Sequence, residues 1–275
     1  MALGVEDLYW GGDVRRYLRL YRAMVLASLQ REIEFRANFW AKVAQNLVWM
    51  GFFIAILKVF YGQTDSIAGW SEGQSFLLFA TCYMMGSVAG AVFGMSVVEL
   101  PTLVRLGTLD YVLVKPVDSQ FWVSVRLFNF DQIGTVAASF GLLAYGLRLE
   151  NLSPNLQQLL VYIALTLAAL LLFYALQFVL MTLGIWLVRV ENLWVVGESV
   201  FQVARFPLDI FPALLQKLFL YAIPLAFIAT VPTRALWGQV ETWVVWLGVG
   251  WSLVAVIACR WFWRFALRYY TSASS

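Results

Sequence analysis

The chain has 275 residues, of which 62% are hydrophobic and 13% charged, and its mean hydropathy is +0.77. This balance excludes an ordinary soluble domain and indicates an all-α polytopic membrane protein. The net charge is +3 and histidine is absent, which excludes metal sites and catalytic triads that depend on imidazole.

The N-terminal region predicts an interfacial helix. Residues 1–13 are acidic and lack a cationic stretch before an apolar core, so we expect no cleavable signal peptide. Residues 14–36 combine an apolar stripe with arginines at i, i+4 and i+7, namely Arg15, Arg19 and Arg22. This pattern is typical of a basic amphipathic helix that lies in the headgroup plane. No basic domain accompanies the arginines, so nucleic-acid binding is not expected.

Two apolar runs follow, and they predict the first two spans at residues 38–60 and 75–98. In the second run Gly86, Gly90 and Gly94 repeat at every fourth residue. Such a stripe lets another helix approach closely, either within the chain or from a second subunit. Cys82 and Cys259 both lie inside apolar runs and predict buried thiols rather than a disulfide framework.

A long polar interruption at residues 99–120 separates the second and third spans. Pro101 suits the first turn of a short helix, Gly107 suits a helix end or tight turn, and Pro116 stops what precedes it. We therefore predict a short helix and turn on the membrane surface. An ordinary surface loop is the alternative, but the length of the segment and its mixture of apolar and charged residues suit docking to a partner.

The next apolar runs predict the third, fourth and fifth spans at residues 121–147, 156–188 and 193–211. The fourth is too long for a 30 Å core, so we expect it to tilt or project beyond the bilayer. The next polar break, at 189–192, is predicted to form a second, minor contact with the partner that docks at 99–120. In the fifth, Arg205 and Asp209 are spaced to pair on one helical face, and Pro207 and Pro212 disrupt the helix around them. They form either a functional site within the membrane or a salt bridge at the outer headgroups.

Residues 213–232 are apolar but are interrupted by Lys217, Pro224 and Pro232, and residues 243–262 predict the last span. A seventh span would place Arg260, Arg264 and Arg268 outside the cell. The preference of basic residues for the inner side therefore favours a re-entrant hairpin at 213–232, six spans and both termini inside.

The sequence contains no motif for ATP hydrolysis. There is no G-x-x-x-x-G-K-[ST] loop, and no nucleophile with a base or pair of carboxylates gathers in one run. The chain is therefore predicted not to be an enzyme, and a transport process driven by ATP would need a separate ATPase chain.

Residues 106–117, LGTLDYVLVKPV, resemble the G-x-LDY-x-L-x-(K/R)P segment of bacterial ABC-2 type permeases, the membrane subunits of ATP-binding-cassette exporters. The segments ARFP at 204–207 and IPLAFIATVP at 223–232 match the same family in order and spacing. The resemblance implies one permease domain over residues 1–275 with a type V exporter-like fold. Its parts are an elbow helix at 14–36, a coupling segment at 99–120 and a re-entrant segment at 213–232.

The resemblance also implies site residues. The residues expected to couple to the ATPase are Leu103, Arg105, Leu106, Gly107, Thr108, Leu109, Asp110, Tyr111, Lys115 and Pro116. Those expected at an outer gate are Arg205, Pro207, Asp209, Pro212, Pro224 and Pro232.

The implied partners are two copies of an ABC ATPase, a second permease that is identical or homologous, and membrane lipid. No cofactor is expected on this chain, since ATP and magnesium would bind the ATPase. The expected activity is export of an amphipathic, lipid-like, polysaccharide or drug-type cargo across a bacterial cytoplasmic membrane. A membrane scaffold that does not transport, or an ion-coupled carrier, is the alternative.

Overall fold

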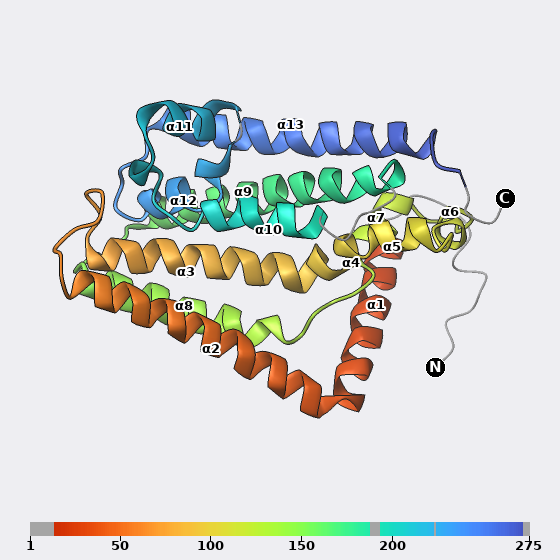
Figure 1. Cartoon of the computed structure of the whole chain (residues 1–275), viewed down its shortest axis with the longest axis horizontal. Helices are drawn as coiled ribbons and strands as arrows, with labels where there is room; N and C mark the ends of the chain where they lie inside the picture. Colours follow the sequence, from red (N-terminus) through yellow and green to blue (C-terminus); the bar gives the residue numbers. More distant parts are fainter. Residues whose placement is uncertain (1–13, 188–192, 223, 272–275) are drawn as a thin grey trace.

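A computed structural model describes residues 14–187, 193–222 and 224–271 (Figure 1). Within these ranges the chain is helical and has no β-strand, which confirms the all-α prediction. Most helices run along the long axis of the molecule, whereas α1 lies across it (Figure 1). The predicted polar break at 189–192 and the acidic start at 1–13 lie outside the described residues.

The α-helices are α1 (Val14–Glu34), α2 (Arg36–Tyr61), α3 (Glu72–Ala89), α4 (Met95–Val98), α5 (Leu100–Arg105), α6 (Asp110–Leu113), α7 (Ser119–Val125), α8 (Gln132–Leu149), α9 (Leu156–Thr182), α10 (Leu193–Val203), α11 (Ala213–Lys217), α12 (Thr230–Ala235) and α13 (Thr242–Leu267). A π-helical turn at Gly90–Gly94 joins α3 to α4, and a second lies at Leu218–Ala222.

Four helical stretches of the described chain are long and apolar enough to cross a membrane: Arg36–Tyr61, Glu72–Arg105, Leu156–Ile185 and Thr242–Leu267. They correspond to the predicted spans at 38–60, 75–98, 156–188 and 243–262. The stretch that contains α3 is central, because 72% of its most apolar window is buried inside the protein. By contrast, only 11% of the corresponding window of α2 is buried, so α2 lies at the edge of the bundle.

Helices α3 and α8 pack closely against each other at two glycines. A Cβ added to Gly146 would lie 3.0 Å from the Leu77 side chain and 3.1 Å from the Gly73 carbonyl oxygen. A Cβ on Gly73 would lie 2.5 Å from the Glu150 side chain. Small residues therefore let these helices approach closely, although we did not predict this pair from the sequence.

The predicted stripe of Gly86, Gly90 and Gly94 has a different environment within the chain. A Cβ on Gly86 would meet the Phe201 ring at 3.1 Å, and one on Gly90 would meet the Gln132 side chain at 3.6 Å. On Gly94 it would meet only the Ala89 carbonyl of its own helix, at 3.3 Å. No other helix backbone therefore approaches this stripe among the described residues, and a contact with a second subunit stays a prediction.

The predicted continuous span at 121–147 is wrong, because the chain is broken between α7 and α8. The freed backbone groups bond to the neighbouring helices instead. Leu127 N–H donates to Ser96 Oγ at 2.9 Å, and Asn129 N–H donates to the Ala91 carbonyl at 3.0 Å. Phe128 N–H donates to Ser28 Oγ at 3.1 Å. Irregular backbone in an apolar medium is stable only where the protein supplies such partners.

The predicted fifth span at 193–211 is also wrong as one helix, since α10 ends at Val203. Pro207 has no N–H to continue the helix, and a 3₁₀ turn follows at Leu208–Ile210. The chain then folds into short helices up to α12. Residues of α12 and of the turn before it pack on α9, and Ile228, Ala229 and Thr233 are fully buried.

We predict that Gly248→Leu destabilises the bundle, whereas Gly250→Leu on the same helix does not. A Cβ at Gly248 would lie 2.6 Å from the Phe227 ring and 3.3 Å from Leu165, but at Gly250 nothing lies within 4 Å. Overpacking of this kind costs about 1–3 kcal/mol. Thermal unfolding and size-exclusion profiles in mild detergent would measure the difference. Equal behaviour of the two variants would contradict the packing of α13 against Phe227.

Candidate functional site

The segment 99–120 forms a compact turn at one end of the bundle. The stretch that begins with α3 continues through α5 to Arg105, with Pro101 in the first turn of α5 as predicted. Gly107 then adopts a φ of +68°, the left-handed conformation that favours glycine. Its N–H donates to the Val104 carbonyl at 3.1 Å, and Leu109 N–H donates to the Leu103 carbonyl at 3.1 Å. The end of α5 is thereby capped, and the chain turns back into α6.

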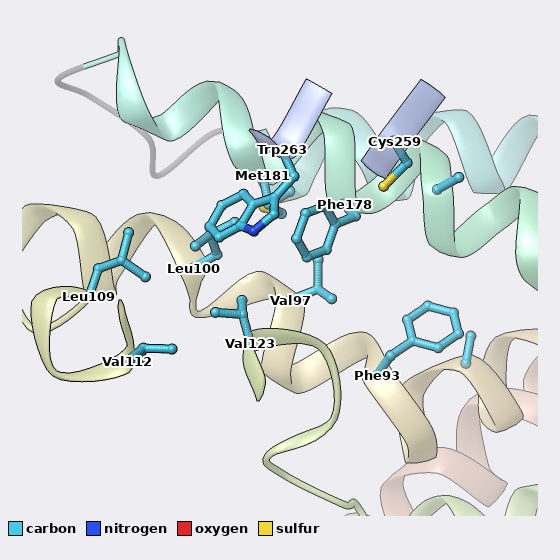
Figure 2. Packing of buried hydrophobic residues seen from close by; sticks show 12 residues of the cluster. Phe93, Val97, Leu100, Leu109, Val112, Val123, Phe178, Met181, Cys259 and Trp263 are labelled. Atoms are coloured by element: carbon cyan, nitrogen blue, oxygen red, sulfur yellow. The ribbon is translucent and has the colours of Figure 1, made fainter. Parts of the chain in front are cut away.

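One face of this segment is buried in the main hydrophobic cluster. Leu100 and Leu109 are fully buried and Val112 is 5% exposed. They belong to the same cluster as Phe178 of α9 and Trp263 of α13 (Figure 2). The turn is therefore fixed to α9 and α13 by apolar packing as well as by its own hydrogen bonds.

The opposite face of the segment exposes apolar side chains. Tyr111 is 71% exposed, Val114 is 80% exposed and Leu106 is 64% exposed. We define the end patch as the exposed apolar residues of this turn: Leu106, Tyr111, Leu113, Val114 and Pro116. Apolar residues gathered on a rigid turn are typical of a surface that binds another protein.

The start of α7 ties the end patch to the last helix through a polar junction. Asp118 caps α7 by accepting from the Phe121 N–H at 3.0 Å, and its carboxylate pairs with the Arg260 guanidinium of α13. Arg260 also donates to Gln120 Oε1 at 3.0 Å, and Trp263 Nε1 donates to Ser119 Oγ at 3.1 Å. Burial raises the pKa of Asp118, but the hydrogen bonds and charge of Arg260 outweigh it and hold that pKa below its usual value.

Helix α1 holds the same junction from the other side. Arg16 donates to the Pro116 carbonyl at 2.5 Å, and Asp118 N–H donates to the Tyr17 hydroxyl at 3.2 Å. The Tyr17 and Phe121 rings pack edge to face with centroids 4.9 Å apart. The helix across the bundle is thus joined directly to the turn that presents the end patch.

Two further charges of the segment are engaged within the chain. Glu99 pairs with Arg126, and the Lys115 ammonium lies 3.5 Å from the centre of the Trp122 ring. Burial, and secondarily the Arg126 charge, lower the pKa of Lys115. These contacts orient the predicted coupling residue Lys115 inward toward α7, so it is less suited to a partner than the end patch.

The other predicted coupling residues divide between the two faces. Arg105 is exposed, whereas Leu103, Gly107, Thr108 and Asp110 are half-buried. Burial and the Asp110 carboxylate together raise the pKa of the Tyr270 hydroxyl to about 12. Asp110 therefore interacts electrostatically with Tyr270, near the C-terminal end of the described chain. The sequence alone did not indicate this interaction.

Apart from Arg205, which follows the end of α10, the predicted outer-gate residues lie in the segments around α11 and α12, at the opposite end of the bundle (Figure 1). The predicted pair of Arg205 with Asp209 is wrong. Asp209 instead accepts from Trp70 Nε1 at 2.7 Å and from Arg234 at 2.5 Å. Pairing at i, i+4 requires a continuous helix, and the chain leaves the helix before Pro207.

The four predicted gate prolines mark the starts of short helical segments. Pro207 and Pro224 precede 3₁₀ turns, Pro212 precedes α11, and Pro232 lies in the first turn of α12. Each position suits a residue without an N–H. Pro207, Pro224 and Pro232 are buried, whereas Pro212 is exposed.

The family model described as "ABC-2 family transporter protein" matches residues 47–274, which is most of the chain. No curated protein and no solved structure matches it.

We predict that Asp118→Asn and Arg260→Gln each loosen the turn that carries the end patch. Both variants break the same junction, so the double variant should add little to either single change. Protease cleavage within 106–118 should become faster in each single variant. Arg264→Gln is the matched control, since Arg264 lies one turn further along α13 and is exposed. Strictly additive effects would show that the two residues act separately.

Proposed function

Because the chain belongs to the ABC-2 family of transporter proteins, we propose that it is the transmembrane permease of an ATP-driven exporter that moves an amphipathic cargo. The chain is a multi-pass membrane protein and a permease of an ABC transporter, and it is not itself the catalytic component. In our proposal, two ABC ATPase subunits carry the ATP and magnesium. A second permease, identical or homologous, completes the complex in a bacterial cytoplasmic membrane.

The end patch is the observation that carries this proposal. It combines exposed apolar side chains with a buried underside fixed to α9, α13 and α1. We propose that the ATPase docks on it and that segment 99–120 is the coupling segment. A rigid turn can transmit the movement of a bound subunit, whereas a loose loop would absorb it.

The path of transmission in this proposal is the helix that begins with α3. This helical stretch extends from Glu72 to Arg105 and includes the π-helical turn at Gly90–Gly94, so it joins the end patch to the far end of the bundle. At about 1.5 Å per residue its 34 residues measure roughly 51 Å. We propose that its movement opens an outer gate, formed by Arg205, the Asp209–Arg234 pair and the proline-bounded segments around them.

The proposed topology has six crossings and both termini in the cytoplasm. The four long apolar helices supply four of them. Helix α8, which packs along α3, supplies the fifth crossing. Helix α10 and the turns that follow it supply the sixth. Helix α1 then lies in the inner headgroup region as an elbow, and residues 213–232 re-enter from the outer side.

We predict that Tyr111→Asp and Val114→Asp abolish recovery of an ATPase chain with the tagged protein from native membranes in mild detergent. A buried carboxylate without a partner at an apolar interface disfavours binding. Tyr221→Asp is the control, since Tyr221 is 50% exposed and lies outside the end patch.

The wild-type chain and the control should recover a stoichiometric ATPase, and the two patch variants should remain folded without it. An intact wild-type protein that brings down no ATPase would contradict the exporter proposal. Normal recovery by both patch variants would contradict docking at the end patch alone.

A further inference from the structure

Two adjoining cavities lie along the glycine face of α3. Their volumes are about 420 Å³ and 400 Å³, and both are lined by Gly86, Gln132, Glu198 and Phe201. We refer to them together as the α3–α10 groove. The glycines themselves place no side chain in the groove, where Phe201 and Gln132 lie against Gly86 and Gly90, and the volume of each cavity is within the range of small-molecule sites.

The groove contains one cation and one anion without a partner of opposite charge among the described residues. The Arg205 guanidinium lies 5.6 Å from the centres of the Phe53 and Phe201 rings and 5.7 Å from that of Tyr83. Its Nε is buried and has no hydrogen-bond partner in the described chain, and the same holds for Oε2 of Glu198. Both residues line the larger cavity.

An unpaired charge of either sign is costly inside a membrane-spanning bundle, and such residues mark functional sites in membrane proteins. Arg205 and Glu198 are seven residues apart and form no ion pair with each other. Two charges held apart in one cavity are suited to a ligand that brings a counter-charge to each of them.

We propose that the α3–α10 groove binds an amphiphile with a zwitterionic head group. A phosphate or carboxylate of the ligand pairs with Arg205, where the three rings support the guanidinium and leave its N–H groups for the anion. An ammonium group pairs with Glu198. The apolar part of the ligand lies along the glycine face of α3, beside Phe201 and Phe173.

A ligand with one charge would not complement this cavity. A purely anionic head would satisfy Arg205 but face Glu198, and a purely cationic head would satisfy Glu198 but face Arg205. The identification of this ligand as the exported cargo rests on the proposed function, whereas the binding site itself does not.

The test measures binding of three fluorescent single-chain probes to the purified full-length protein in a neutral maltoside detergent, without ATPase or nucleotide. The probes are lysophosphatidylethanolamine, lysophosphatidylglycerol and an alkyltrimethylammonium of matched chain length. The wild-type protein should bind the zwitterionic probe about tenfold or more tightly than either of the others.

Two variants should change this preference in opposite directions. Glu198→Gln should shift it to the anionic probe, and Arg205→Gln should shift it to the cationic probe. Lys217→Gln is the control, since Lys217 is exposed and does not line the groove. Arg205→Lys retains the positive charge and should keep the wild-type order, which protects the test against a poorly folded Arg205→Gln protein.

Equal affinities for the three probes, or an unchanged order in Glu198→Gln, would overturn the assignment. A protein that recovers no ATPase would overturn the proposed function and leave this binding result standing. ATP-dependent movement of the zwitterionic probe in liposomes that contain the whole complex would identify the ligand as cargo. Binding without such movement would identify it as a resident bilayer lipid.

Discussion

The constraint on which the rest of this structure depends is that backbone N–H and C=O groups in hydrocarbon must find partners inside the protein. The chain meets it in most places with long helices, and α3 at the centre of the bundle is the most buried of them. Where the chain leaves the helix, between α7 and α8, the partners come from α4, from the π-helical turn before it and from α1. The π-helical turn at Gly90–Gly94 contains the Ala91 carbonyl that accepts the Asn129 N–H. The break between α7 and α8 is therefore hydrogen-bonded to the π-helical turn that follows α3.

Several charged side chains in the interior also find partners within the protein. Polar side chains within the bundle are joined across large sequence separations, as in Asp118 with Arg260 and Asp209 with Trp70 and Arg234. The first pair lies near the end patch, and the second cluster lies at the opposite end. Together they connect the N-terminal half of the bundle to α13 and α12. Between these two clusters the α3–α10 groove contains Arg205 and Glu198, for which the described chain provides no counter-charge.

Sequence patterns predicted the parts of the fold that depend on local chemistry. Four long apolar runs became four membrane-capable helices, and Pro101 and Gly107 occupy the positions that their backbone preferences indicate. The patterns failed where tertiary contacts decide. The break after α7 is stabilised by Ser96 and Ser28, which no local signal around residue 127 reveals. The spacing in the sequence predicted that Arg205 pairs with Asp209. Because the backbone beyond Val203 is not helical, the Asp209 carboxylate pairs with Arg234 instead.

The contacts of Trp263 and Arg260 have a consequence for biosynthesis. These residues belong to α13, which is synthesised after the other described helices, yet they pack beneath the turn at 99–120 and secure the start of α7. The turn therefore lacks its full support until α13 has been made and inserted. A nascent or truncated chain would present this surface in a loosened form. A subunit that docks at this turn, as we propose, would then bind well only to chains whose α13 is already in place.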